Sequence, residues 1–431
     1  MLKSEKSNSE TFKMNTNNRT KLRVLAQRTA LSLFALLLFS SCEDIFEVVN
    51  PGPILDTALD EEASGKTVLT GAIADVEVSA NMFILYSGVA STDMNADATR
   101  PWVQIPSTGS LEPINDEVWA PGHLGRWSAE AAIERLTTSQ SAGASSPLVA
   151  AAYLWAGYAN RLLGDNVCIT VIDGGAPSSS DDHYKRAIEH FNNAITGAKA
   201  AGDTDIETAA LAGKAQCNLI LGNYADAASD AGKIDDDFLF VAHRDDNSSR
   251  EHNWTWSESH DQKQITAWGR YVSDSTSVDY GDPRTPYEDT QMLSASGTRP
   301  FYRQKKYPER GSDIPLAKGA EMRLIEAEVL LRNGDVSGSM AKINGVRAAA
   351  GVAEKAASTE SEAWLALDQE RHIVLWLEAR RLKDNSRFQG LSSLSKDFMS
   401  GVGFDSKSPR DECFPPSLAE ISANVNITDW P

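Results

Sequence analysis

Paired helices of small and apolar residues, joined by short turns, are the feature that most restricts the fold of this chain. Residues 209–231 read AALAGKAQCNLILGNYADAASDA, with Gly222-Asn223 between the two halves. Small residues let two helices approach closely, and a Gly-Asn pair favours a turn. The segment therefore predicts a tetratricopeptide-like hairpin with helices at about 206–221 and 224–233.

The same helical spacing of apolar residues occurs on both sides of this hairpin. Upstream, residues 147–164 and 184–201 predict two helices, and Pro147 suits the first turn of one of them. Downstream, residues 320–331 and 336–350 flank the turn residues Asn333-Gly334-Asp335, and residues 362–388 predict one long helix.

These elements predict a mainly α fold with about four tetratricopeptide-like helical pairs. Two segments, at about 91–128 and 234–319, lack helical periodicity and are rich in Trp, Pro or Gly. We expect long irregular loops there, which separate the helical pairs into a non-contiguous array. Long loops in a compact protein usually carry function, so the ligand side is expected at these segments.

The charge of the chain excludes some functions. Its formal net charge of −19 argues against nucleic-acid binding, which requires clustered Lys and Arg. Four cysteines among 431 residues cannot form a disulfide framework.

A secretory signal is predicted at residues 1–41. The apolar stretch LSLFALLLF at 31–39 is too short to span a bilayer, follows several basic residues and precedes Ser40-Ser41-Cys42. A start at Met14 would give a signal of ordinary length. The arrangement resembles a bacterial lipoprotein signal, in which Cys42 is acylated and becomes the first mature residue; the alternative is cleavage without lipidation.

Removal of the signal makes the protein more acidic. Residues 1–41 contain seven basic and two acidic side chains, so the net charge changes from −19 to −24. Membrane association would therefore depend on lipid and not on basic residues.

Cys168, Cys217 and Cys413 remain after removal of the signal and allow at most one disulfide, whose partners the spacing does not identify. The apolar surroundings of Cys168 and Cys217 favour buried free thiols.

The motifs of the C-terminal half resemble the SusD/RagB-like outer-membrane lipoproteins, and the resemblance covers essentially the whole mature chain. The strongest similarity lies in residues 320–387. The matching segments are AEMRLIEAEVLLRNGD (320–335), Ile343-Asn344-Gly345-Val346-Arg347, Glu370-Arg371 and Glu378-Ala379-Arg380-Arg381, supported by Asp282-Pro283-Arg284 and by Cys413-Phe414-Pro415-Pro416 with Glu420 and Asn424. Residues 383–387 (KDNSR) depart from the family's Asp-Leu-x-Arg.

The resemblance implies a single SusD-like α-rich domain at 42–431 that binds nutrients and is not an enzyme. Members of the family are lipid-anchored in the outer membrane at the cell surface. They capture glycans, or peptides in some branches, and act as the lid of a SusC-like TonB-dependent transporter. No cofactor is implied. We expect the charged motif residues on apolar helices to form scaffold ion pairs, because a carboxylate near a core requires a cation; these residues are Glu326, Glu370, Glu378, Arg371, Arg380 and Arg381. Asn344 and Arg347 are expected to tie helix to loop.

Side-chain chemistry points to candidate ligand residues in the two loop-rich segments. A flat aromatic ring covers the C–H face of a sugar, while a few polar groups satisfy its hydroxyl rim. Trp155, Trp364 and Trp376 lie in helical patterns and are expected in the core, and Trp127 is discounted because it begins a helix-like run. If WTW is a strand, Trp254 and Trp256 share one face. The candidates are Trp102, Trp254, Trp256 and Trp268, with Asp93, Asn95 and Arg100 as a polar rim.

Other constellations support no catalytic or metal site. His183 and His190 share a helical face without a third ligand, His252 and His260 flank WTW, and Asp235-Asp236-Asp237 lacks the spacing of a calcium loop. The chain has no P-loop, H-E-x-x-H, G-x-S-x-G or C-x-x-C motif. Three functions compete: a glycan-binding transporter lid, the same architecture binding peptides or another oligomer, and a hydrolase or helical-repeat scaffold.

Overall fold

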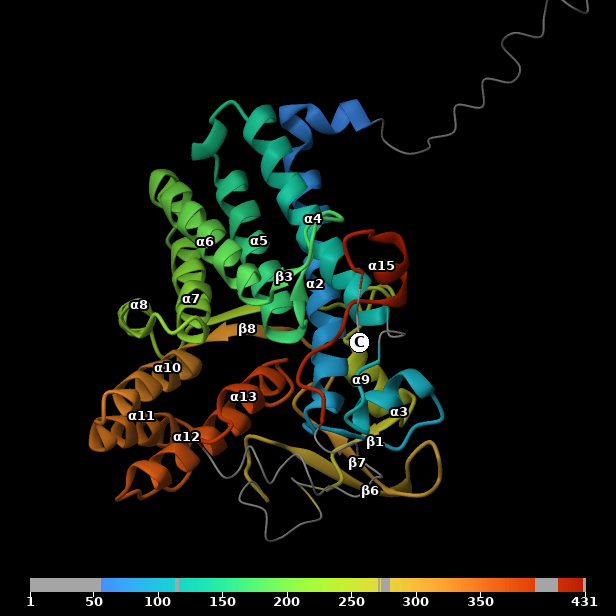
Figure 1. Cartoon of the computed structure of the whole chain (residues 1–431), viewed down its shortest axis with the longest axis vertical. Helices are drawn as coiled ribbons and strands as arrows, with labels where there is room; N and C mark the ends of the chain where they lie inside the picture. The colour runs from blue at the N-terminus through green and yellow to red at the C-terminus, as the bar shows by residue number, and fades with distance from the viewer. Residues whose placement is uncertain (1–55, 113–115, 270–271, 273–279, 392–409, 429–431) are drawn as a thin grey trace, which may run out of the picture. The chain divides into compact units, whose positions relative to one another are not determined.

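The computed structural model describes residues 56–428 except 113–115, 270–271, 273–279 and 392–409. The predicted signal at 1–41 and Cys42 lie outside the described residues. The described chain is mainly α-helical, as the sequence predicted (Figure 1).

Most predicted helices are present with small changes at their ends. The helices of the array are α2 (Gly65–Ala90), α4 (Asp116–Ser139), α5 (Pro147–Asn166), α6 (Asp181–Ala201), α7 (Thr204–Ile220), α8 (Tyr224–Ala231), α10 (Gly319–Arg332), α11 (Val336–Ala349), α12 (Glu360–Val374) and α13 (Arg381–Arg387). Shorter helical segments are η1 (Asp56–Asp60), η2 (Glu62–Ser64), α3 (Pro101–Ser107), η3 (Gly143–Ser145), α9 (Trp254–Trp256), η4 (Ser257–Asp261) and α15 (Leu418–Ala423).

Local sequence explains where several helices begin. Ser146 caps α5 by accepting a hydrogen bond from the amide of Leu148, and Pro147 is its first residue. Thr359 and Glu362 form a reciprocal capping box at the start of α12. Gly202 ends α6 in the left-handed conformation, with φ of 72°, which glycine adopts without steric cost.

The helical array is continuous in space, which corrects the predicted separation of its pairs. Neighbouring helices pack from α4 through α5, α6, α7 and α8, and α8 then packs directly on α10, which packs on α11 and α12. Figure 1 shows α7 and α8 next to α10. The two ends of the long insertion between α8 and α10 therefore lie close together, and the insertion does not interrupt the packing of the array.

Two further predictions about helices are wrong. Residues 91–128 are not irregular throughout, since they contain α3 and the first half of α4. The predicted helix 362–388 is broken after Val374, because Leu377 and Ala379 have left-handed backbone with φ of 57° each. The buried side chain of Asp93 holds this break by accepting a hydrogen bond from the amide of Leu377.

The insertions contain short antiparallel strands in two-stranded pairings within the described residues. The pairs are β1 (Asn95–Ala96) with β5 (Ile265–Thr266), β2 (Ile169–Thr170) with β3 (Ser178–Ser179), β4 (Leu239–Ala242) with β8 (Ile314–Lys318), and β6 (Tyr287–Leu293) with β7 (Pro300–Gln304). The register of the first pair, Asn95 opposite Thr266, joins the two loop-rich segments.

The larger of two apolar clusters includes residues of α2 and of α4 to α7, and the smaller cluster lies mainly in α10, α11 and α12. Among the described residues, the helical stretch Glu62–Ala90 alone is long and apolar enough to cross a membrane, but 61% of its most apolar window is buried in the protein. It is therefore the central core helix of this fold. As predicted, Trp155, Trp364 and Trp376 are buried.

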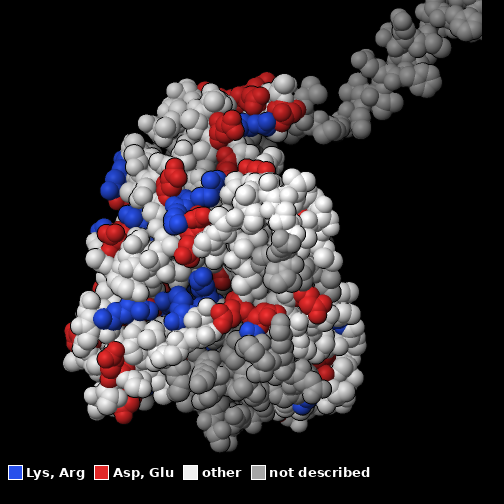
Figure 2. Space-filling view, viewed as in Figure 1, with Lys and Arg blue, Asp and Glu red and all other residues white. Residues whose placement is uncertain are grey.

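The charged motif residues form the expected scaffold ion pairs, most of them buried. Glu370 binds Arg284 and Arg347, and Arg380 binds Asp165 and Glu321. The other pairs are Arg371–Asp384, Arg381–Asp368, Glu378 with Lys306 and Lys318, and Glu326 with Arg323 and Lys342. Asn344 and Arg347 bond the main chain at Lys355 and Ala353, which ties α11 to the following loop as expected. On the face drawn in Figure 2, basic side chains also adjoin acidic ones.

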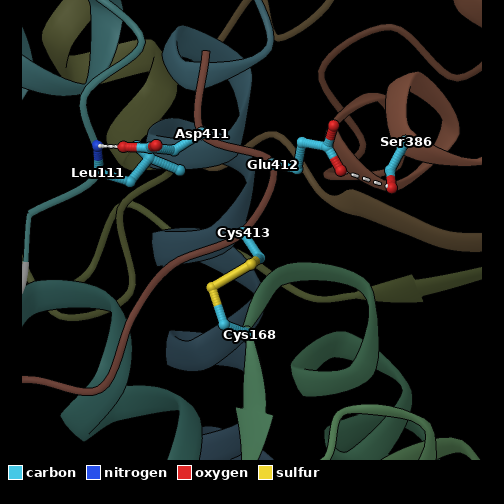
Figure 3. Close-up of a disulfide and its surroundings, with 6 residues drawn as sticks. All are labelled: Leu111, Cys168, Ser386, Asp411, Glu412 and Cys413. Atoms are coloured by element: carbon cyan, nitrogen blue, oxygen red, sulfur yellow. Dashed lines mark hydrogen bonds between the residues drawn. A yellow bond between two sulfur atoms is a disulfide. The ribbon is translucent and has the colours of Figure 1, made fainter. Parts of the chain in front are cut away.

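A disulfide between Cys168 and Cys413 corrects the expectation of a free thiol at Cys168 (Figure 3). Cys217 is a buried free thiol, as expected, and burial raises its pKa.

We call residues 410–414 the C-terminal strap. Beside the disulfide, the amide of Phe414 donates to the carbonyl of Asn166 at 2.7 Å, and the amide of Cys168 donates to the carbonyl of Phe414 at 2.9 Å. The strap thus closes on the end of α5.

Candidate functional site

A hollow beside the exposed ring of Trp102 is the best candidate for a ligand site in the loop-rich segments. Its volume is about 200 Å³. Its apolar surface comes from α3, and its polar groups come from the following loop and the start of α4. The lining residues are Pro101, Trp102, Ile105, Pro106, Ser110, Glu112 and Glu117. Trp102 is 46% exposed, so one large part of its ring is open to solvent.

Proline shapes the short helix that presents Trp102. Pro101 is at the first position of α3, where its fixed backbone and missing N–H suit a helix start. Buried Pro106 lies inside α3 and, with half-buried Ile105, forms the apolar floor of the hollow. The helix therefore offers a rigid apolar platform on which the indole projects.

Arg100 fixes the start of α3 to the other loop-rich segment. Its guanidinium bonds Glu258 at 2.6 Å and Gln262 at 2.8 Å, both in or next to η4, and lies 6.0 Å from the centroid of the Trp102 ring. Burial raises the pKa of Glu258, although the charge of Arg100 opposes this shift. Arg100 thus joins the two loop-rich segments, and its guanidinium also lies beside the ring of Trp102.

The C-terminal strap fixes the other end of α3. Arg410 donates to the carbonyl of Ser107 at 2.7 Å, and Asp411 accepts from the amide of Leu111 at 2.8 Å (Figure 3). The amide of Asp411 also donates to the carbonyl of Gly109 at 2.9 Å. The main chain around the loop that carries Ser110 and Glu112 is therefore held by side chains and one amide of the strap.

Asp93 and Asn95 do not form the predicted polar rim, because both are buried. The carboxylate of Asp93 pairs with His372 at 3.0 Å and accepts from the amide of Leu377 at 3.0 Å. Asn95 lies in β1, and its side chain donates to the carbonyl of Trp268. Both side chains are bonded inside the protein. Asp93 stabilises the break after α12, and Asn95 stabilises the pairing of β1 with β5.

The WTW segment is a helical turn, α9, and not a strand. Trp254 and Trp256 are each partly buried, and each indole N–H donates to a main-chain carbonyl, at Ser249 and Pro308 respectively. The Trp256 ring stacks on His260 with 4.9 Å between centroids, and Arg310 lies 5.0 Å from it. These contacts pack the loop onto the body.

Trp268 is also partly buried, and the guanidinium of Arg299 lies 4.7 Å from its ring centroid. In the described part of the chain, no ring contact joins Trp102 to Trp254, Trp256 or Trp268. The structure thus places one of the four candidate tryptophans, Trp102, at an open hollow.

Sequence patterns missed the other residues of the hollow. Ile105, Pro106, Ser110 and Glu117 carry no motif, although their closeness to Trp102 in the sequence was a usable signal. Trp127 was discounted, yet it is 55% exposed on α4. Its helical pattern indicated a helix correctly but did not show which side of that helix faces solvent.

No group of three potential metal ligands occurs among the residues that the structure describes. His183 is buried against Asn160 at 3.1 Å, whereas His190 contacts Glu130 at 3.1 Å. Burial lowers the pKa of His260 to about 4, with a smaller contribution from Arg303. These histidines act in packing and hydrogen bonding.

Comparisons with known proteins agree with this architecture. Residues 205–416 match the model of the SusD family. A SusD superfamily protein from Bacteroides thetaiotaomicron VPI-5482 is 14% identical, with a TM-score of 0.61 over 86% of this chain and 98% of that one. A SusD-like carbohydrate-binding protein from Bacteroides vulgatus ATCC 8482 is 13% identical, with a TM-score of 0.59 over 76% and 84%.

A third solved structure, described as a laminarin-binding SusD-like protein, is 15% identical, with a TM-score of 0.60 over 86% of this chain and 99% of that one. No curated protein sequence matches the chain. At these identities the structural likeness concerns the fold.

Proposed function

Because residues 205–416 belong to the SusD family and the described chain has the SusD-like fold, we propose that this protein captures glycans at the outer-membrane surface. Cys42 would carry the lipid anchor. The captured oligosaccharide would pass to a SusC-like TonB-dependent transporter, for which the protein acts as a lid. The protein binds without catalysis in this proposal.

The exposed ring of Trp102 above the hollow carries the glycan proposal. The C–H face of a pyranose stacks on a flat aromatic ring, whose large apolar area supplies most of the binding energy. Ser110, Glu112 and Glu117 stand at the rim, where they can bond sugar hydroxyls and fix orientation. The solved relatives described as carbohydrate- and laminarin-binding support the same ligand class.

The two carboxylates of the hollow favour binding over hydrolysis. A glycosidase needs a general acid that its surroundings keep protonated, typically through burial. Glu112 and Glu117 are both exposed. They suit hydrogen bonding to hydroxyl groups, and assay of reducing-sugar release by the purified protein tests this part of the proposal.

Affinity electrophoresis tests the glycan site. Gels containing laminarin, starch or another soluble glycan should retard the protein, and Trp102→Ala should weaken the interaction by about 10- to 30-fold, because buried aromatic anchors dominate such interfaces. Trp127→Ala is the matched control, since Trp127 is also exposed but lies outside the hollow.

Equal retardation of Trp102→Ala and Trp127→Ala would contradict the assignment of the site. Binding of oligopeptides, with no retardation by any glycan in the panel, would instead favour the peptide-binding alternative.

A further inference from the structure

A cavity of about 510 Å³, larger than the hollow at Trp102, lies on another part of the molecule. Its walls come from the segment before β6, the segment after β7, the end of β8 and the ends of α11 and α12. We call it the basic cavity, because its charged lining residues are Arg284, Lys305, Lys306, Lys318 and Glu378. Pro283, Pro286 and Val346 are among its apolar lining residues.

The floor of the basic cavity holds more positive charge than its carboxylate requires. Lys306 and Lys318 both bond the same oxygen, Oε1, of Glu378. One lysine would neutralise this glutamate, so the group retains one positive charge. At the rim, Lys305 and Arg303 share Glu288 at 3.6 and 3.0 Å, which leaves a second excess charge.

Other charged groups also act on the cavity, and the carboxylate of Asp93, which pairs with His372, is one that acts on Lys306. Arg284 forms a bidentate contact with Asp282 and also binds Glu370, which Arg347 binds at 2.7 Å. Two cations thus face two anions. The carbonyl ends of α11 and α12 oppose the excess with about −0.5 each. Lys305, Lys306 and Lys318 at the floor and rim outnumber the two carboxylates that they bond, Glu378 and Glu288.

Both floor lysines also keep a donor for a ligand. An ammonium group has three N–H donors. Among the described residues, Lys306 uses two, on Glu378 and the carbonyl of Trp376, and Lys318 uses two, on Glu378 and the carbonyl of Val374. Burial lowers the pKa of Lys306 to about 8 although Glu378 opposes the shift, so a further anionic partner would favour its charged form.

We propose that the basic cavity binds a small anionic ligand through a carboxylate or sulfate group, which Lys306 and Lys318 hold at its floor. Among the described residues, its lining includes no aromatic ring, in contrast to the hollow at Trp102. Acidic sugars such as uronic acids carry this chemistry, and free inorganic anions share it. The site is independent of Trp102, so it does not rest on the proposed glycan site.

Titration calorimetry of the purified protein with D-glucuronate, sodium sulfate and neutral D-glucose tests the proposal. We expect saturable one-to-one binding of glucuronate and none of glucose at this cavity. Ala349 is exposed and lines the cavity without belonging to an ion pair. Ala349→Glu should weaken glucuronate binding at least about tenfold by like-charge repulsion.

Two control variants separate the effect of a charge in the cavity from the effect of added side-chain volume and from that of a charge elsewhere on α11. Ala349→Gln adds the same volume without charge, and Ala341→Glu adds the charge at an exposed position of α11 outside the cavity lining. Both should bind as the unaltered protein does. Thermal unfolding confirms that each variant folds.

Equal affinity for sulfate, with the same variant pattern, would support the anion site and assign it to an inorganic ligand. Absence of binding by both anions, or unchanged glucuronate binding in Ala349→Glu, would overturn the proposal.

Discussion

At the scale of single residues, the interior of this protein is organised by carboxylates that each hold two cations. Glu370 binds Arg284 and Arg347, and Glu328 binds Arg332 and Arg387. Burial alone would raise the pKa of Glu328, but the neighbouring arginines, with Arg387 first, lower it. Such groups stay charged inside the protein because bidentate guanidinium contacts compensate for lost hydration.

Glu370→Gln tests this arrangement. The substitution removes the carboxylate that Arg284 and Arg347 share. Arg284 keeps its ion pair with Asp282, whereas Arg347 loses its ion pair with Glu370. We expect a loss of about 3–5 kcal/mol in the free energy of unfolding, typical of a broken buried ion pair. Urea unfolding followed by circular dichroism measures the effect.

Glu354→Gln is the control for this substitution, because Glu354 is exposed. Its effect should stay within about 0.5 kcal/mol. A similarly small effect of Glu370→Gln would show that the buried pairs contribute little to stability.

At the scale of elements, the C-terminal strap connects parts of the chain that are far apart in sequence. The disulfide Cys413–Cys168 joins the strap to the segment after α5 (Figure 3). Glu412 accepts a hydrogen bond from Ser386 of α13 at 2.8 Å. Asp411 accepts one from the amide of Leu111 in the loop after α3. The disulfide closes 245 residues of sequence. The strap therefore stabilises both the array and the loop at the Trp102 hollow.

Replacement of both cysteines, as in the double variant Cys168→Ser with Cys413→Ser, should destabilise the protein. We expect a loss of about 2–4 kcal/mol, since the cross-link restricts the unfolded chain. Reducing agent should lower the urea midpoint of the unaltered protein but not that of the double variant. Equal midpoints of the unaltered protein with and without reductant would contradict a stabilising role of the disulfide.

The break between α12 and α13 shows why element boundaries escaped the sequence pattern. Residues 362–388 have helical periodicity throughout, yet Leu377 and Ala379 adopt φ of 57°. The cost of left-handed backbone in residues other than glycine is about 1–2 kcal/mol. Tertiary contacts offset it here: Trp376 donates to the carbonyl of Asp93, and Lys306 and Lys318 bind carbonyls at the break.

At the scale of the whole molecule, neutral buried histidines make stability depend on pH. Burial, with a smaller contribution from Arg126, lowers the pKa of His123 to about 3. Burial also lowers the pKa of His183 strongly, with His123 and Arg126 adding to the effect. Both rings stay neutral in the folded protein but become protonated in the unfolded chain below about pH 6.5.

Stability should therefore fall as pH decreases from 6.5. The unfolded state binds more protons in this range, and each histidine contributes up to about 2 kcal/mol of loss between pH 6.5 and 5. His123→Phe should reduce the slope of the urea midpoint against pH in this range, because it removes one of these groups. His243→Gln, at an exposed histidine, should leave the slope unchanged.

Two other effects of acidification can be separated from the histidine effect. The self-repulsion of a chain with net charge −19 weakens on acidification, but it acts equally on both variants. Carboxylates with lowered pKa, such as Glu130, lose their contribution at lower pH. An identical slope in His123→Phe and the unaltered protein would contradict the assignment to buried histidines.

The helical body was largely predictable from the sequence, whereas the site was predictable only in part. The spacing of apolar residues located α5 to α8 and α10 to α12, and the acidic and basic motif residues indicated buried ion pairs. Trp102 lies at an open hollow, and its contact with a ligand stays a prediction. Asp93 and Asn95 are buried, and the sequence did not indicate this because polar residues in a loop pattern look the same whether they face solvent or bond the interior.

The sequence by itself determined the helical pairs, the predicted lipoprotein signal and the resemblance to the SusD family, because these depend on local spacing and short motifs. Only the tertiary structure decided that Cys168 joins Cys413, that α8 meets α10, and that Lys306 and Lys318 share Glu378. These contacts join residues distant in the chain, and their partners follow from packing and desolvation, which no local pattern encodes.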